Sequence, residues 1–506
     1  MFEITTPESI GVSSKQVLRF YKKLEQRRMT VHSVLMMRGD KIFTEAYWKP
    51  FSQDFCHRMY SVTKSFVGVA IGILEQEGKI KLTDKIADYF RDKIHRELPE
   101  WFENQTIRDM LLMSTCVSNN SWFMAEETDR VELYFNKTWQ FRPSGTSWRY
   151  DSPGSQVLCE LVERISGKSF FEFMKEKIFD YLGTFKTARM LKTKNDACWG
   201  DSAMICTTRD LASFGKFVMN YGTWEGKRLV NEEYLKTATS AVVSNAEEGG
   251  GFNNLHHVGY GYLIWRVMDN AFAFVGMGHQ LMIAIPEKDL IFCCTSDSQG
   301  SSFSCDGFIL PLYDNIIDFL GDEPLPEDKE AYAELTDYCS NLELRSLKDY
   351  EYKPMQDKIN GKKYIVQPLP EGIEVLDIKN RTGIKEFTLN FTGDGEGELV
   401  LINAQGEKRI PFGMNKNVFG KFPQYGYYDE HGGVKMTNDF TYKDAVSATW
   451  RDDNKLTIFV QIIDNYFGNC TMNFSFRDEY ATVQMRSNAE YFLQEYYGDF
   501  VAKMEE

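Results

Sequence analysis

The chain has 506 residues, of which 43% are hydrophobic and 14% aromatic, and its formal net charge is −15. A chain of this length exceeds what one hydrophobic core usually serves, so two or three domains are expected. The acidic charge argues against nucleic acid as a partner, because phosphate binding needs a basic surface. No apolar run approaches the roughly 20 residues that a membrane-spanning helix needs, so no membrane partner is expected.

The ten cysteines lack the CxxC spacing of metal and redox motifs. In a chain of this size without a visible secretory signal, such cysteines are typical of reduced, mostly buried thiols. We therefore expect a cytoplasmic location.

In chain order, residues 12–28 carry apolar side chains at helical spacing and predict a helix. The segment 33–48 predicts a β-hairpin with an Arg-Gly-Asp turn, and residues 61–77 predict a helix that ends at Gly78. The pattern is mostly helical from 83 to 235, strand-like over 258–298, and helical again over 308–320. Strands at both ends with helices between them predict an α+β domain over residues 1–320. Its antiparallel sheet would be flanked by helices and carry a helical insertion.

The rest of the chain has a different texture. Residues 321–350 begin with an acidic, proline-containing stretch and are the expected linker. From 351 to 506, short alternating segments separated by Gly, Asn and Asp predict an all-β domain, a barrel or a sandwich. The last segment, 488–504, is expected to form an amphipathic helix.

Ser61 and Lys64 are three positions apart, so on a helix they share one face. A serine that opens a helix offers its hydroxyl as a nucleophile and its backbone N–H as one oxyanion donor, while an uncharged lysine amine can accept the hydroxyl proton. The spacing alone is a weak signal, because an N-cap serine followed by a solvated lysine looks the same. The apolar run that follows predicts a buried helix, where a lysine is costly unless it has a role or a partner.

Several motifs in order resemble the serine β-lactamase-related family, which includes class C β-lactamases, penicillin-binding DD-peptidases and their esterase and D-aminopeptidase relatives. The resemblance covers roughly residues 1–320 and rests on the segments 60–90, 106–115, 142–183 and 200–230. The family's second motif, Tyr-x-Asn or Tyr-x-Ser, is Tyr150-Asp151-Ser152 in this sequence.

The resemblance implies roles for four residues. Ser61 would be the nucleophile, Lys64 the proton acceptor, Tyr150 the group that relays the proton to the leaving group or the deacylating water, and Ser152 would orient Lys64. From the residues alone, Tyr150 could equally be a core aromatic, and Ser152 could be a helix cap or turn residue.

The third motif departs from the family pattern of Lys-Thr-Gly or His-x-Gly on the strand facing the nucleophile. Aligned on residues 280–290, Met277 falls at the basic position and His279 at the glycine, whereas a slip of two residues would put His279 at the basic position. His279 is then a substitute donor or an ordinary strand histidine, and the Gln280 N–H is the expected second oxyanion donor. Because Met277 cannot pair with a carboxylate, its presence disfavours β-lactamase or DD-peptidase activity.

These observations predict a serine hydrolase that cleaves a small ester or amide, short peptides included, through an acyl-enzyme on Ser61. No cofactor is expected, and no metal either, because the adjacent His256 and His257 have no further ligands at suitable spacing. A non-catalytic ligand-binding or regulatory protein on the same fold remains an alternative, as does a β-lactamase or DD-peptidase. The C-terminal domain loosely resembles the lipocalin-like barrels of some D-aminopeptidases.

Overall fold

The computed structural model describes residues 2–117, 129–246, 258–268, 270–302, 304–348, 353–368, 382–425, 441–489 and 493–505. His256 and His257 lie outside these residues. Tertiary contacts divide the chain into two units, the first ending at Glu343 and the second beginning at Leu344.

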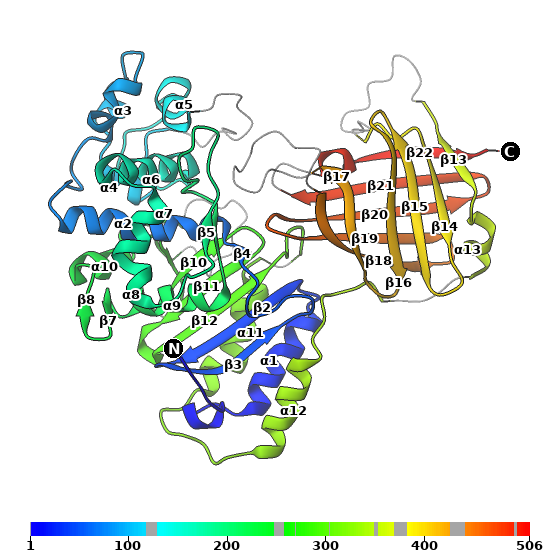
Figure 1. The fold of residues 1–506 in the computed structure, drawn as a ribbon, viewed down its shortest axis with the longest axis horizontal. Coiled ribbons are helices and arrows are strands. Elements are labelled where there is room, and N and C mark those ends of the chain that lie inside the picture. The colour runs from blue at the N-terminus through cyan, green and yellow to red at the C-terminus, as the bar shows by residue number, and fades with distance from the viewer. Residues whose placement is uncertain are drawn as a thin grey trace. The chain divides into compact units, whose positions relative to one another are not determined.

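The first unit is built on a seven-stranded sheet with the order β1-β3-β2-β12-β11-β10-β9 (Figure 1). Neighbouring strands are antiparallel except for the parallel pair β1 and β3. The strands are β1 (Glu3–Ile4), β2 (Val31–Arg38), β3 (Lys41–Tyr47), β9 (Trp265–Arg266), β10 (Phe272–Gly276), β11 (Gln280–Ile285) and β12 (Leu290–Ser296). Every residue of β10, β11 and β12 is buried, because helices cover both faces of the sheet.

Helices from the two ends of the first unit cover one face of this sheet. Phe20 of α1 (Ser14–Gln26) packs edge-on against Phe292 of β12, and α1 contacts both α11 (Asp306–Asn315) and α12 (Lys329–Ser340). On the opposite face, Gly215 of α9 (Thr208–Met219) lies directly against Met282 of β11. The predicted flanked antiparallel sheet is confirmed.

The helical insertion between β3 and β9 contains the helix expected after Ser61. Its members include α2 (Thr63–Gln76), α3 (Glu100–Glu103), α4 (Ile107–Leu111), α5 (Arg130–Lys137), α6 (Ser152–Ser166), α7 (Phe170–Met174), α8 (Asp180–Leu182) and α10 (Glu232–Ala238). Small sheets also lie here, formed by β4 (His57–Arg58), β6 (Met204–Cys206) and β5 (Arg189–Met190), and by β7 (Thr223–Trp224) and β8 (Lys227–Arg228).

Helix α2 is buried on all sides from Thr63 to Leu74, as its apolar sequence predicts. Two of its glycines allow neighbours to approach closely: a Cβ at Gly68 would lie 2.6 Å from the Tyr262 carbonyl oxygen, and one at Gly72 would meet the Tyr234 ring at 2.4 Å. The helix is therefore held firmly behind the serine at its start.

The expected linker, 321–350, contains ordered structure. Within it, α12 packs against α1, and surface ion pairs join Lys15 to Asp328 and Lys22 to Glu334. The division between the units falls after Glu343, within hydrogen-bonded chain: the Lys49 N–H donates to the Leu342 carbonyl oxygen, and Asn417 donates to that of Leu344. The acidic, proline-containing stretch at the start of the expected linker therefore lies before the division between the units.

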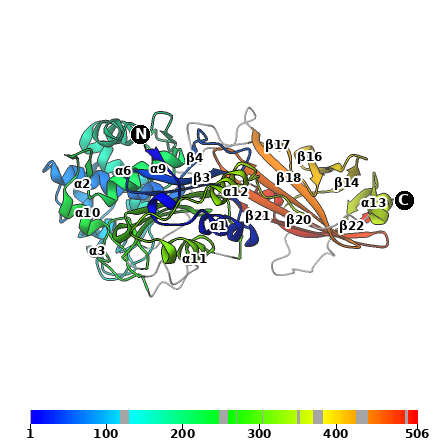
Figure 2. The same cartoon turned by 90° about the horizontal axis from the view of Figure 1, so that it is seen from below.

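The second unit is a ten-stranded sheet with the order β16-β15-β14-β13-β22-β21-β20-β19-β18-β17 (Figures 1 and 2). Pairing of β16 with β18 closes it into a barrel, which confirms the expected C-terminal β domain. The strands are β13 (Lys363–Val366), β14 (Glu386–Phe391), β15 (Glu396–Asn403), β16 (Gly406–Met414), β17 (Val418–Tyr425), β18 (Thr441–Asp452), β19 (Lys455–Ile463), β20 (Phe467–Arg477), β21 (Tyr480–Ala489) and β22 (Gly498–Met504); the short helix α13 (Lys353–Ile359) precedes them.

The prediction of an amphipathic helix at the C-terminus is wrong. Residues 498–504 form strand β22, which pairs with β21 on one side and β13 on the other. Phe500 and Ala502 are buried, and Val501 between them is exposed, so the segment follows the strand period of two. Ladder hydrogen bonds on both edges outweigh the local helical pattern. Separately, no helix within the described residues is both long and apolar enough to cross a bilayer.

Candidate active site

Ser61 and Lys64 lie together at the start of the buried helix. Ser61 is in the short 3-10 turn Tyr60–Val62, and α2 continues from Thr63. The Lys64 Nζ donates a hydrogen bond to Ser61 Oγ at 2.9 Å, and the lysine is only 2% exposed. The i,i+3 spacing therefore brings the hydroxyl and the amine into direct contact in a site largely shielded from water.

A backbone carbonyl holds Lys64 from the other side. The Lys64 Nζ donates to the Asp201 carbonyl oxygen at 2.6 Å. This carbonyl is close because the segment leading into β6 runs beside the chain before Ser61: Met59 N–H donates to the Met204 carbonyl, and Met204 N–H donates to Thr63 Oγ1. The amine is thus fixed between a hydroxyl and a carbonyl.

No hydrogen bond joins Ser152 to Lys64 in the described part of the chain. Ser152 is buried at the first position of α6. The bond that would orient the amine comes from the Asp201 carbonyl. The helix-start alternative for Ser152 therefore agrees with its position, and its predicted role in orienting Lys64 stays a prediction.

The Tyr150 ring faces the lysine. Lys64 Nζ lies 5.1 Å from the centre of this ring, and the Tyr150 ring stacks on Trp265 of β9 with centroids 5.8 Å apart. Trp148 and Tyr260 pack edge-on against Trp265. Within the described part of the chain, the Tyr150 hydroxyl has no hydrogen-bond partner, so it is available to a ligand. Catalytic contacts often tighten only when substrate binds.

Asp151, the middle residue of the second motif, is buried and bonded to groups outside the Ser61–Lys64 pair. Asp151 caps α6 by accepting from the Gly154 N–H at 3.0 Å, and it also accepts from the hydroxyls of Thr115 at 2.8 Å and Tyr134 at 3.3 Å. Burial raises the pKa of its carboxyl, partly offset by these bonds. Asp151 therefore anchors the backbone beside Tyr150.

The end of β10 lies against the chain around Ser61. A Cβ built on Gly276 would lie 2.3 Å from the Met59 carbonyl oxygen and 3.3 Å from the Ser61 backbone nitrogen. Only glycine allows this approach. Among the described residues, neither the Ser61 N–H nor the N–H of Met277, next after Gly276, has a hydrogen-bond partner. Two free donors are what an oxyanion hole requires.

His279 and Gln280 lie in the turn and strand beyond Gly276. His279 has a φ of 69° and packs near Phe308, and burial lowers the pKa of its imidazole to about 4. Gln280 pairs with Gly276 in the β-ladder, and its buried side chain donates to the carbonyls of Met277 and Ser296. His279 is therefore uncharged at neutral pH, and the side chain of Gln280 fixes the turn.

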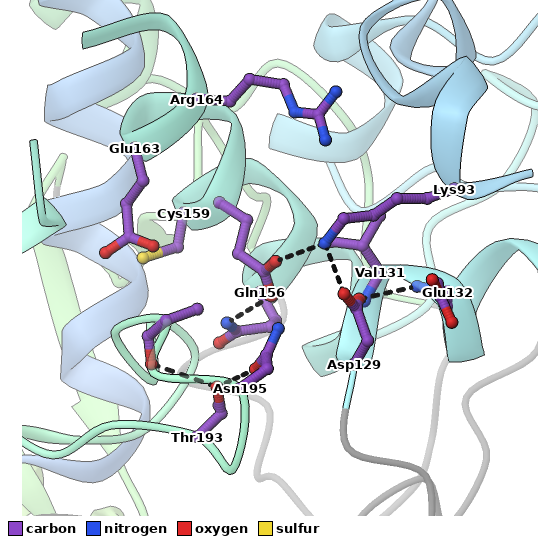
Figure 3. Close-up of polar contacts among 12 residues, drawn as sticks. Lys93, Asp129, Val131, Glu132, Gln156, Cys159, Glu163, Arg164, Thr193 and Asn195 are labelled. Carbon is purple, nitrogen blue, oxygen red and sulfur yellow. Dashed lines mark hydrogen bonds and ion pairs between the residues drawn. The ribbon is translucent and has the colours of Figure 1, made fainter. Parts of the chain in front are cut away.

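A polar network is centred on helix α6 (Figure 3). The Gln156 side chain accepts from the Gly200 N–H at 2.7 Å and donates to the Cys198 carbonyl at 2.9 Å and to Glu160 at 3.1 Å. Lys93 lies 2.6 Å from Asp129 and 3.5 Å from Glu160. Burial raises the pKa of Glu160 to about 7, and the more distant contact with Lys93 does not offset this.

Glu160→Gln is expected to remove a pH dependence of stability. The carboxyl titrates near 4.3 in an unfolded chain and at about 7 in the folded protein, so between these values the folded state binds more protons. Wild-type stability should therefore fall as pH rises from about 4.5 to about 7, with a total loss of about 1–3 kcal/mol. Urea unfolding at pH 5 and pH 8 measures this loss, and parallel pH profiles for wild type and variant would contradict it.

The beta-lactamase family model matches residues 19–306, which is more than half of the chain. The chain belongs to the beta-lactamase family. The 6-aminohexanoate-dimer hydrolase of Paenarthrobacter ureafaciens is 23% identical over 255 residues, which cover 46% of this chain and 63% of that protein. Penicillin-binding protein 4* of Bacillus subtilis (strain 168) is 26% identical over 143 residues, 26% of this chain and 30% of its own.

Among solved structures, a family VIII carboxylesterase is similar with a TM-score of 0.50 and 16% identity, covering 63% of this chain and 99% of its own. This likeness supports the fold alone. The chain spans less than two thirds of the length of the 6-aminohexanoate-dimer hydrolase. Membership of the beta-lactamase family, a family of hydrolases, confirms the resemblance found in the motifs.

The register of the third motif stays a prediction. Gly276 lies against Ser61, and taking it as the motif glycine would put Phe274 at the basic position. The sequence alignment had placed Met277 there. Both registers put an uncharged side chain at this position. In that register, the residue three places after the basic position, which is the expected second oxyanion donor, is Met277 rather than Gln280.

Three residues of this site were not found from the sequence. The Asp201 carbonyl and the Gly276 approach are backbone features, which side-chain identity does not reveal. Trp265 could have been noticed as a tryptophan in an early strand of the 258–298 run, but its partner Tyr150 lies more than 100 positions earlier. Only the tertiary fold brings the two rings together.

Proposed function

We propose that this chain is a serine hydrolase that cleaves a small uncharged ester or amide through an acyl-enzyme on Ser61. The observation that supports this best is the contact between a buried lysine amine and the serine hydroxyl at 2.9 Å. A buried amine next to a hydroxyl is how a serine is activated without a histidine.

In the proposed mechanism, the Lys64 amine takes the Ser61 hydroxyl proton as Oγ attacks the substrate carbonyl. The Ser61 N–H and a second backbone N–H would stabilise the resulting oxyanion. We propose Met277 for the second donor, because it follows the glycine that abuts Ser61; Gln280, predicted from the sequence, is the alternative.

The leaving group then departs with a proton from the Tyr150 phenol, which faces Lys64 and can regain a proton from its ammonium. Water attacks the acyl-enzyme in the second half of the reaction, activated by the same pair of groups. Ser61 regains its proton as the acid product leaves.

The lack of a cation at the third motif bears on substrate choice. Phe274 and Met277 cannot pair with a carboxylate, and His279 is neutral above its pKa of about 4. A substrate carboxylate placed there would lose its hydration without gaining a partner. The 6-aminohexanoate-dimer hydrolase is named for an amide substrate, which supports the amide part of this proposal.

A substrate panel tests the proposal. We expect hydrolysis of p-nitrophenyl esters of short uncharged acids at a kcat/KM at least about 100-fold above that for nitrocefin, because an unpaired buried carboxylate costs about 3 kcal/mol or more. Faster turnover of nitrocefin would contradict the preference. Failure of every ester, amide and penicillin on folded protein would favour the non-catalytic alternative.

A further inference from the structure

The segment 198–201 brings the Asp201 carbonyl to Lys64, and helix α6 supplies several of the bonds that hold it; the Trp199 N–H also donates to the Leu191 carbonyl, and Arg58 donates to Ser202. The Gln156 side chain donates to the Cys198 carbonyl and accepts from the Gly200 N–H. The Cys198 N–H donates to Glu163 at 3.2 Å. Packing supports these bonds: a Cβ on Gly200 would lie 2.1 Å from Cys159 Cβ, one turn further along α6. The segment has little room to shift.

Gln156 is the link between this segment and the rest of the network. Its side chain is fully buried, its carbonyl oxygen accepts one bond, and its amide nitrogen donates two. Glu160 receives one of those bonds and connects through Lys93 to Asp129 (Figure 3). A buried amide whose hydrogen bonds are satisfied in this way fixes one arrangement of its neighbours.

We propose that Gln156 is a positioning residue for the catalytic amine: by holding Gly200 it sets the position of the Asp201 carbonyl that receives the Lys64 hydrogen bond. The proposal rests on the proposed function and adds to it a residue that touches neither substrate nor Ser61. The path is continuous, from Gln156 Oε1 to the Gly200 N–H, along one peptide unit to the Asp201 carbonyl, and to Lys64 Nζ at 2.6 Å.

Loss of this link should misplace the amine rather than remove it. Without the Gly200 bond, the Asp201 carbonyl can move relative to α2, while Lys64 remains on its own helix. A displacement of about 1 Å in catalytic geometry can lower a rate by about 100-fold. The pH profile of Ser61 labelling should therefore also differ from that of wild type.

The test is the pH profile of covalent labelling by a fluorophosphonate probe. Gln156→Leu has nearly the same shape but cannot hold Gly200, and we expect its second-order labelling rate to fall about 10–100-fold and the midpoint of its profile to move by about 0.5 or more pH units. The matched control is Gln461→Leu in the barrel, a buried glutamine that donates to the Arg345 carbonyl. It should leave the labelling profile unchanged.

A second variant keeps the test decisive if Gln156→Leu does not fold. The double variant Gln156→Glu with Glu160→Gln restores two of the three bonds: a carboxylate at 156 accepts from Gly200, and an amide at 160 donates to that carboxylate, while the bond to the Cys198 carbonyl is lost. It should recover at least about tenfold of the rate lost by Gln156→Glu alone, in which two carboxylates face each other.

The outcomes separate this inference from the proposed function. Labelling of Gln156→Leu at the wild-type rate and midpoint would overturn the positioning role while leaving the hydrolase intact. A fall in labelling of the same size in the control Gln461→Leu would also overturn it. Absence of any labelling of folded wild type would overturn both.

Discussion

Lys64→Met is expected to lower the rate of Ser61 acylation by about 10²–10⁴-fold while the protein stays folded. The variant keeps a flexible side chain of similar length, so α2 loses no packing. It also removes an amine that is 2% exposed, and relief of its burial offsets the loss of its bond to the Asp201 carbonyl. Stability should therefore remain within about 1–2 kcal/mol of wild type. Probe labelling and urea unfolding measure the two effects.

A second buried lysine provides the control. Lys216 of α9 is 5% exposed, and its Nζ lies 3.0 Å from Asp289. Lys216→Met removes a buried amine of the same kind from a different environment, so labelling should continue at the wild-type rate. If Lys64→Met retained more than about a tenth of the wild-type rate, Lys64 could not be the proton acceptor.

Gly276→Ala is expected to reduce acylation by about 100-fold or more and to destabilise the protein by about 1–3 kcal/mol. The added methyl group would lie 2.3 Å from the Met59 carbonyl oxygen, far inside van der Waals contact. The Met59 carbonyl oxygen and the Ser61 nitrogen, at 3.3 Å, are backbone atoms and cannot rotate away. Strand β10 must move from Ser61, and the two oxyanion donors separate. Labelling rates and unfolding curves measure both losses.

The control for this variant is a glycine without close neighbours. A Cβ on Gly393, in the barrel, would meet nothing within 4 Å, and its backbone needs no left-handed conformation. Gly393→Ala should match wild type in both assays. Labelling of Gly276→Ala at the wild-type rate would show that β10 can move from Ser61 without slowing acylation. It would contradict the proposal that Met277 is an oxyanion donor.

The part of the site predicted best from the sequence follows local rules. Ser61 and Lys64 share a helix, and helical geometry brings positions three apart into contact whatever the rest of the fold. Tyr150 was expected near them only through the family resemblance, because its approach depends on how α6 and β9 pack. The sheet, the hairpin at 33–48 and the barrel also follow from alternation and turn residues.

The remaining features depend on contacts that the local sequence does not encode. The strand pattern does not fix the register of the third motif, because the turn between β10 and β11 has two glycines, Gly276 and Gly278, that could each align with the motif. The Asp201 contact uses a backbone carbonyl, which every residue type has, so the sequence could not single it out. The C-terminal strand was predicted as a helix because its two pairing partners, β13 and β21, cannot be recognised from its local sequence. Strand β13 lies more than 100 residues earlier in the chain.

The most direct test of the account is the site at which a fluorophosphonate probe modifies the protein. Intact mass and peptide mapping of wild type should show one adduct, on the peptide that contains Ser61, and Ser61→Ala should show none. An adduct on another residue, or equal labelling of Ser61→Ala, would contradict the assignment of Ser61 as the nucleophile.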